Sequence, residues 1–138
     1  MPEGTIPHLD EIVRLAAPGE PFVVSLVGRS MHPALREGDQ LVVDPPGGRP
    51  RLGDVIVFPY AGRMLAHRVI GCGADGILAA GDASTGQRER VRFERVVGVV
   101  RAARRNGRPL WRPSSRMRAL FLRLRLAVVY RMRMGRPA

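Results

Sequence analysis

Short apolar segments separated by turn-forming residues make up most of the chain between Pro21 and Trp111. Glycine, proline and aspartate stand between these segments, which is typical of strands joined by tight turns. Asn106-Gly107 predicts a hairpin turn with positive φ at both central residues. The pattern predicts a compact, mainly antiparallel β fold. The expected strands are 22–27, 40–44, 54–59, 64–70, 76–80, 91–93, 96–103 and 110–111.

Two segments are predicted to be helical. Apolar residues recur at helical spacing from Leu9 to Ala16, and Pro18-Gly19 end the pattern, so we expect a short N-terminal helix over 8–16. The segment 114–134 is rich in leucine, methionine, alanine and arginine, which favours a helix that begins near Ser114 or Ser115. Its arginines do not gather on one face, so the predicted amphipathicity is modest and a strand remains the alternative.

The formal charge of +11 is distributed unevenly along the chain. Residues 1–87 contain 7 arginines and 10 acidic residues, a net charge of −3. Residues 88–138 contain 16 arginines and 2 acidic residues, a net charge of +14. We therefore expect a folded domain over 1–112 and a basic, partly apolar tail over 113–138, suited to an anionic surface.

Several classes of protein are disfavoured by composition. Cys72 is the only cysteine, so no disulfide can form within the chain. The three histidines and Cys72 lack the spacing of metal ligands, so we predict neither a metal site nor a cofactor. No stretch reaches the roughly 18 apolar residues of a spanning helix, and no secretory leader is recognisable. We expect the protein to be cytoplasmic, or peripheral at the cytoplasmic membrane.

Ser30 is the candidate nucleophile, because it lies on a turn directly after an apolar strand. A serine hydroxyl needs a base to accept its proton. The chain contains no lysine, and arginine does not act as a base, so the base must be His8, His32 or His67. His32 is disfavoured as the base, because it is only two residues from Ser30 in sequence.

Five segments, in order, resemble those of the type I signal peptidases. The segment that contains Ser30 resembles the nucleophile box, and Ala66-His67-Arg68-Val69 resembles the strand that carries the general base. Together the five cover roughly residues 22–101 and imply a signal-peptidase-like β fold. They are residues 27–39, 51–58, 66–71, 80–84 and 96–100.

Histidine immediately before Arg68-Val69 is similar to the archaeal and endoplasmic-reticulum branch of this family. The resemblance implies a serine endopeptidase with Ser30 as nucleophile, His67 as base and Asp82 orienting the imidazole ring. It also implies an extended leader or signal peptide as substrate, cleaved after small residues and bound as an added strand. The implied oxyanion and substrate-binding residues are Gly28, Arg29, Met31 and Pro33.

The chain departs from the family pattern at three points. Gly28 stands where the family often has a serine that helps the oxyanion hole, and glycine there is similar to the self-cleaving repressors of the DNA-damage response. Arg88 stands six positions after Asp82, where the histidine branch tends to have a second acidic residue. The N-terminal membrane anchor usual in the family is not recognisable. A repressor-like or nucleic-acid-associated regulator and a non-catalytic peptide-binding protein are therefore the alternatives.

The basic tail is expected to bind an anionic membrane surface or a membrane partner protein, lying in the interface. Packing against the β domain and binding to nucleic acid are the competing outcomes. Nucleic acid is the less favoured partner, because residues 1–20 are too short for a helix-turn-helix.

Overall fold

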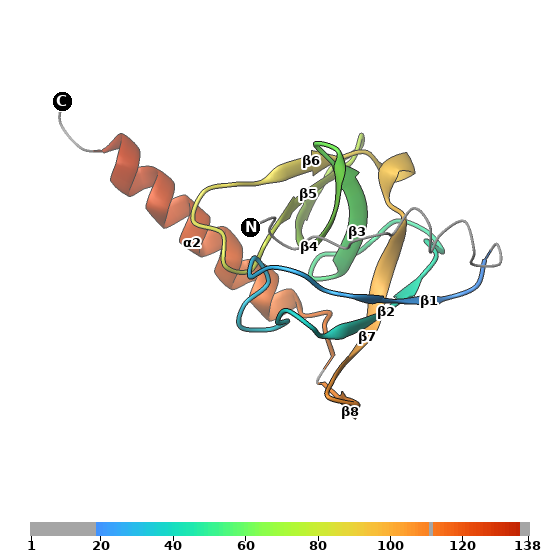
Figure 1. The fold of residues 1–138 in the computed structure, drawn as a ribbon. Coiled ribbons are helices and arrows are strands. Elements are labelled where there is room, and N and C mark those ends of the chain that lie inside the picture. The colour runs from blue at the N-terminus through green and yellow to red at the C-terminus, as the bar shows by residue number, and fades with distance from the viewer. Residues whose placement is uncertain (1–18, 111, 136–138) are drawn as a thin grey trace.

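The computed structural model describes residues 19–110 and 112–135 and confirms a mainly antiparallel β fold with one C-terminal helix (Figure 1). Helix α2 spans Arg116–Met134, and a 3-10 turn, η1, spans Phe93–Arg95. The helix expected over 8–16 lies outside the described residues. The strands are β1 (Phe22–Ser25), β2 (Gln40–Asp44), β3 (Val55–Tyr60), β4 (Arg63–Cys72), β5 (Ile77–Ala80), β6 (Glu89–Val91), β7 (Gly98–Arg105) and β8 (Arg108–Pro109).

The strands form a sheet in the order β1-β2-β7-β3-β4-β5-β6, with β8 paired to β7. Every pair is antiparallel. Figure 1 shows a strongly bent sheet, in which β3, β4, β5 and β6 form the upper part of the view and β1, β2 and β7 the lower part. The two ends of the strand order, β1 and β6, are edge strands among the described residues.

The burial of each strand follows its place in the sheet. In β2, Leu41 and Val43 are buried, whereas the residues before, between and after them are not. This alternation is typical of a strand with one covered face. In β3, residues 55–58 are all buried, because alternate residues of the strand pack into two different core clusters, one on each face. A continuous apolar run is the expected sequence for a strand covered on both faces.

The hairpin turn and the helix start form as the sequence predicts, although the second strand of the hairpin, β8, begins at Arg108, two residues before the expected position. Asn106 and Gly107 have φ of 53° and 76°, so the β7–β8 turn has the two positive φ values expected of it. Ser115 precedes α2, and its side chain accepts a hydrogen bond from the Arg118 N–H at 3.2 Å. This contact satisfies one of the N–H groups left unpaired at a helix start.

Helix α2 packs against the sheet along one stripe of its surface. Ala119, Leu122 and Leu126 are buried and form a cluster with Ile70 of β4 and Ala80 of β5. Their spacing of three and four residues places them on one side of the helix. In Figure 1 the C-terminal half of α2 extends beyond the sheet. Within the described residues, no helix combines the length and apolar character needed to cross a bilayer.

Candidate active site

Ser30 lies on the turn that follows β1, and this turn is fixed on both sides. Leu26 N donates to Asp39 O at 2.9 Å, and Gly38 N donates to Leu26 O at 2.8 Å, which closes the loop behind the serine. Gly28 has a φ of 93°, a conformation that favours glycine. The Ser30 carbonyl accepts a hydrogen bond from Ala83 N at 2.8 Å. The residue is only 6% exposed.

His67 is brought to Ser30 by the central strand β4. It lies opposite Ile56 of β3 in the ladder, and the edge of its ring faces Phe58, with 6.1 Å between ring centroids. Its Nε2 atom lies 3.1 Å from Ser30 Oγ. Ser30 and His67 are 37 residues apart in sequence, so the sheet produces this contact. The structure thus brings the two residues of the expected pair within hydrogen-bond distance.

Glu89 of β6 completes the line of polar contacts. Its Oε2 atom lies 3.1 Å from His67 Nδ1, and the residue is fully buried. An ionised carboxylate accepts hydrogen bonds and cannot donate them, so this contact places the ring proton on Nδ1. Nε2 of the neutral ring is then the acceptor for the Ser30 hydroxyl proton. The second carboxylate oxygen, Oε1, is buried without a hydrogen-bond partner among the described residues.

The expectation that Asp82 orients His67 does not match the geometry. Both Asp82 carboxylate oxygens accept hydrogen bonds from Arg68, at 2.7 Å from Nε and 2.8 Å from Nη2. His67 and Arg68 are consecutive residues of β4, and consecutive strand residues point to opposite faces. Asp82 therefore pairs with the arginine on one face of the strand, while Glu89 pairs with the histidine on the other.

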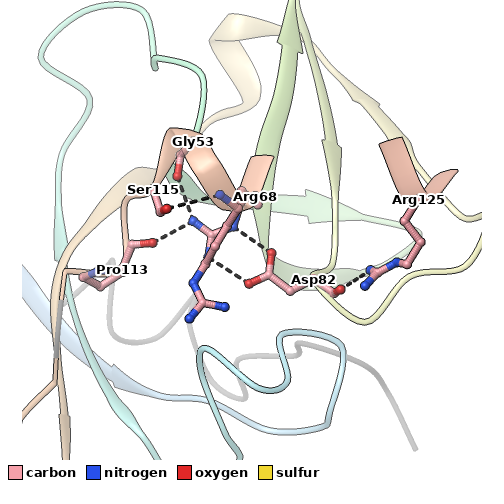
Figure 2. A network of polar contacts seen from close by, with 7 residues as sticks. Gly53, Arg68, Asp82, Pro113, Ser115 and Arg125 are labelled. Atoms are coloured by element: carbon pink, nitrogen blue, oxygen red, sulfur yellow. Dashed lines mark hydrogen bonds and ion pairs between the residues drawn. The ribbon is translucent and has the colours of Figure 1, made fainter. Parts of the chain in front are cut away.

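Arg68 is the centre of a buried network that joins the sheet to the start of α2. Its guanidinium is fully buried, and Nη1 also donates to Gly53 O at 2.9 Å and to Pro113 O at 2.7 Å. Figure 2 shows Asp82 between Arg68 and Arg125, whose Nη2 donates to the Asp82 carbonyl oxygen. Arg125 Nε donates to Ser84 O at 3.1 Å. Helix α2 is thus bonded directly to the loop beside Ser30.

Sequence reasoning missed Glu89 because it placed the sixth strand two residues too late, at 91–93 instead of 89–91. In the correct register Glu89 lies opposite Ala79 of β5 and shares a face with Val91. Both residues are buried, whereas Arg90 between them is exposed. The available signal was this alternation, together with an acidic residue that stands directly between two arginines.

A cleft of about 290 Å³ lies in front of the serine and histidine. Arg29 lines it, whereas Met31 is fully buried in the core. Gly28 is also buried, and Pro33 is exposed outside the cleft lining. Of the four expected binding residues, Arg29 alone lines the cleft. The lining residues are Arg29, Ser30, His67, Gly81, Ala83, Ser84, Thr85, Gln87 and Glu89.

A larger hollow of about 620 Å³ surrounds the β4–β5 turn. Ser30 and His67 do not line it, so size alone does not mark the polar site. His32, the disfavoured base, is half-buried, and it is not among the residues that line the smaller cleft. His8 lies outside the described residues.

The Peptidase S24-like family model matches residues 2–100, which include Ser30, His67 and Glu89. The chain belongs to the Peptidase S24-like family. This family lies in the superfamily that joins self-cleaving repressors with signal peptidases. Comparison with curated proteins and with solved structures gives no significant match. The Peptidase S24-like match ends before α2, and it does not distinguish the signal-peptidase branch from the repressor branch.

Proposed function

We propose that the protein is a serine endopeptidase in which Ser30 is the nucleophile, His67 the general base and Glu89 the residue that orients the imidazole ring. The observation that carries this proposal is the line of two 3.1 Å contacts, from Ser30 Oγ to His67 Nε2 and from His67 Nδ1 to Glu89 Oε2. A nucleophile, a base and an orienting carboxylate in this order are the parts that acyl transfer requires.

The proposed reaction begins with attack of Ser30 Oγ on the peptide carbonyl carbon. The serine proton moves to His67 Nε2, and the carbonyl electron pair moves to the carbonyl oxygen. When this intermediate collapses, the C–N bond breaks and the leaving amine takes the proton from His67. Water then attacks the acyl-enzyme and gives its proton to His67, which returns a proton to Ser30 Oγ. The products are a free carboxyl and a free amine.

Glu89 supports both states of the base. With neutral His67, it accepts the Nδ1–H bond and keeps Nε2 free of a proton. When His67 becomes positively charged, the buried carboxylate stabilises the imidazolium at short range. The one ion-pair partner of Glu89 within residues 19–110 and 112–135 is His67. Its charge therefore acts chiefly on the imidazole ring.

The developing oxyanion needs backbone N–H groups close to Ser30, and we assign this role to the turn formed by residues 28–31. In serine proteases, one such donor contributes about 3–4 kcal/mol to the lowering of the barrier. Gly28 has no hydroxyl to offer, so the hole depends on main-chain donors. The φ of 93° at Gly28 and the Ala83-to-Ser30 bond keep that turn in place.

The proposed substrate is an extended leader-type peptide. Strand β1 is an edge strand with Val23 exposed, and Ser30 lies on the turn that follows this strand. A peptide added along this edge would reach the serine with its backbone hydrogen-bonded, the mode known as strand addition. Gly81 and Ala83 also line the cleft, and such small residues leave room for a bound main chain.

Cleavage of its own chain is the second candidate function. It is favoured by the Peptidase S24-like match and by Gly28, which the chain shares with self-cleaving repressors. The same residues would carry out the same chemistry on a segment of the protein itself. The fraction of chain cleaved per unit time in cis does not depend on protein concentration. The rate of cleavage of an added peptide depends on the concentrations of both the protein and the peptide.

The experiment that tests the proposal is incubation of the full chain with a library of leader-type peptides, followed by mass spectrometry. We expect cleavage at defined sites by the wild type and no cleavage by Ser30→Ala. The same spectra report cleavage of the chain itself over a range of protein concentrations. Intact peptides and an intact chain under all conditions would contradict both forms of the proposal and support a non-catalytic peptide-binding protein.

A further inference from the structure

Helix α2 has a second apolar stripe on the side opposite the one that packs against the sheet. The residues of this outer stripe are between 47% and 68% exposed. Most follow each other at intervals of three or four residues, so they lie on one side of the helix. The outer stripe consists of Met117, Leu120, Phe121, Leu124, Val128 and Met132.

The two opposite stripes explain why the sequence indicated only modest amphipathicity. When apolar side chains lie on two opposite sides of a helix, their contributions to its overall amphipathicity point in opposite directions and cancel. One stripe, around Leu122, is covered by β4 and β5. The outer stripe, around Phe121 and Leu124, is covered by no described residue to a comparable extent. An exposed apolar surface of this kind marks an interaction site.

The charges on α2 indicate what the outer stripe binds. The chain has no acidic residue after Glu94, and α2 itself contains six arginines. By their helical positions, Arg116 and Arg123 lie together on one flank of the outer stripe and Arg118 lies on the other, while Arg131 lies in line with Leu124 near the C-terminal end of the stripe. An apolar stripe bordered by arginines is the pattern of a helix that lies flat in a lipid headgroup layer.

We propose that the outer stripe of α2 binds the surface of a bilayer that contains anionic lipids, with the helix lying in the plane of that surface. A second copy of the chain is a poor occupant, because two such helices would bring arginines together without acidic partners. Nucleic acid would use the arginines but leave the six apolar side chains exposed to water. An anionic bilayer satisfies both features of the helix.

The contacts of Arg125, on one flank of the outer stripe, place the candidate active site close to this surface. Arg125 bonds to the carbonyl oxygens of Asp82 and Ser84, and Ser84 lines the cleft in front of Ser30. A bilayer on the outer stripe would therefore lie near the cleft wall. The binding proposal itself does not depend on catalysis by Ser30.

The test is co-sedimentation of the full-length protein with vesicles of phosphatidylcholine and phosphatidylglycerol, beside vesicles of phosphatidylcholine alone. We expect binding to the anionic vesicles that weakens as salt is raised from about 0.1 M to about 1 M, since the Debye length falls from about 10 Å to about 3 Å. Phe121→Ser/Leu124→Ser should weaken binding about a hundredfold, because two large apolar side chains no longer insert. A Val23→Ser/Tyr60→Ser variant, altered at exposed apolar residues outside α2, is the matched control and should bind as the wild type.

A second pair of variants tests whether binding depends on where the arginines lie or only on the net charge of the protein. Arg116→Gln/Arg123→Gln should weaken binding about thirtyfold. Arg104→Gln/Arg108→Gln removes the same charge from the β7–β8 hairpin and should change binding less than about threefold. Equal binding by the wild type and the Phe121→Ser/Leu124→Ser variant would overturn the proposal. So would tighter retention on duplex DNA than on anionic vesicles at the same salt, or a dimer in solution that the two serine substitutions dissociate.

Discussion

The carboxylate of Glu89 lies 3.1 Å from Nδ1 of His67, on the side of the ring opposite the contact with Ser30. Glu89 comes from β6 and His67 from β4, with β5 between them in the sheet. The contact therefore depends on the register of two strand pairs. A shift of one residue in β6 would turn Glu89 to the other face and bring an arginine, Arg88 or Arg90, to its place.

Glu89→Gln should lower activity with little effect on stability, whereas Asp82→Asn should lower stability with little effect on activity. In Glu89→Gln, the new side-chain amide would be able to donate to Nδ1 and favour the wrong tautomer, so kcat should fall about 10³- to 10⁴-fold. The free energy of unfolding should change little, because an amide is less costly to bury than a carboxylate. Asp82→Asn should instead lower the unfolding free energy by about 3–5 kcal/mol, because it leaves the buried Arg68 charge without its partner.

Peptide hydrolysis and urea unfolding, measured on both variants, check this prediction. For Asp82→Asn, kcat measured below its unfolding transition should stay within about tenfold of the wild type, since Asp82 does not contact His67. A larger loss of kcat in Asp82→Asn than in Glu89→Gln would show that the carboxylates have been assigned to the wrong roles.

Arg68→Met should destabilise the fold by about 3–5 kcal/mol. The substitution leaves the Asp82 carboxylate buried without a partner and removes the donor to Gly53 O and Pro113 O. Urea unfolding of the variant gives the loss directly. Arg63→Met is the matched control, because Arg63 is an exposed arginine of the same strand. Equal stabilities of the two variants would mean that the buried network does not hold α2 to the sheet.

Gly81→Ala should lower kcat without unfolding the protein. A Cβ atom at this position would lie 2.6 Å from the Ser30 carbonyl oxygen and 2.9 Å from Ser30 Cβ, so the nucleophile has to move. A displacement of about 1 Å at a reacting group can reduce the rate about 100-fold. Peptide hydrolysis by Gly81→Ala and by Gly47→Ala, where a Cβ atom meets open space, separates this effect from a general effect of alanine. Equal rates would show that the Gly81–Ser30 contact does not position the nucleophile.

The ion pair between Asp39 and Arg105 should make stability depend on acid pH. Burial acts to raise the pKa of the Asp39 carboxyl, but the hydrogen bond from Arg105, the Arg36 N–H and both positive charges outweigh it and lower the pKa below 3.8. A carboxyl with a lowered folded-state pKa stabilises the fold above its unfolded-state pKa. This contribution is lost as the pH falls from about 4 through the folded-state value.

The measurement is the free energy of unfolding of wild type and Asp39→Asn at several pH values. The wild type should be the more stable at pH 6, and the difference should shrink below about pH 4. Asp75→Asn, altered at an exposed aspartate of the β4–β5 turn, should show no comparable change. A difference between wild type and Asp39→Asn that stays constant with pH would contradict the role given to this pair.

Local patterns allowed most of the fold to be predicted from the sequence. Residues 40–44, a short apolar run bounded by polar and turn-forming residues, form β2 with the expected bounds, and Asn106-Gly107 forms the expected turn. The absence of lysine narrowed the base to a histidine, and the resemblance of the segment around His67 to the base strand of the signal peptidases then pointed to this residue. In each of these cases the information lies in neighbouring residues or in the composition.

The choice between Asp82 and Glu89 could not be made in the same way. It depends on which face of β4 each acidic residue meets, and this is set by pairing between distant strands. The burial of Arg68 was equally hidden, since an arginine in a chain with 23 of them gives no sign that it is internal. The two stripes of α2 became distinguishable once one was seen to be covered by β4 and β5.

The most direct test of the account is whether Ser30 is an activated nucleophile. Treatment of the full chain with a small fluorophosphonate, followed by intact-mass and peptide mass spectrometry, measures this without knowledge of the substrate. We expect one covalent adduct, on Ser30, that is absent in Ser30→Ala, forms far more slowly in His67→Ala, and forms normally in Ser114→Ala. No adduct on the folded wild type, or an adduct that persists in Ser30→Ala, would contradict the assignment of Ser30, His67 and Glu89 as the reacting site.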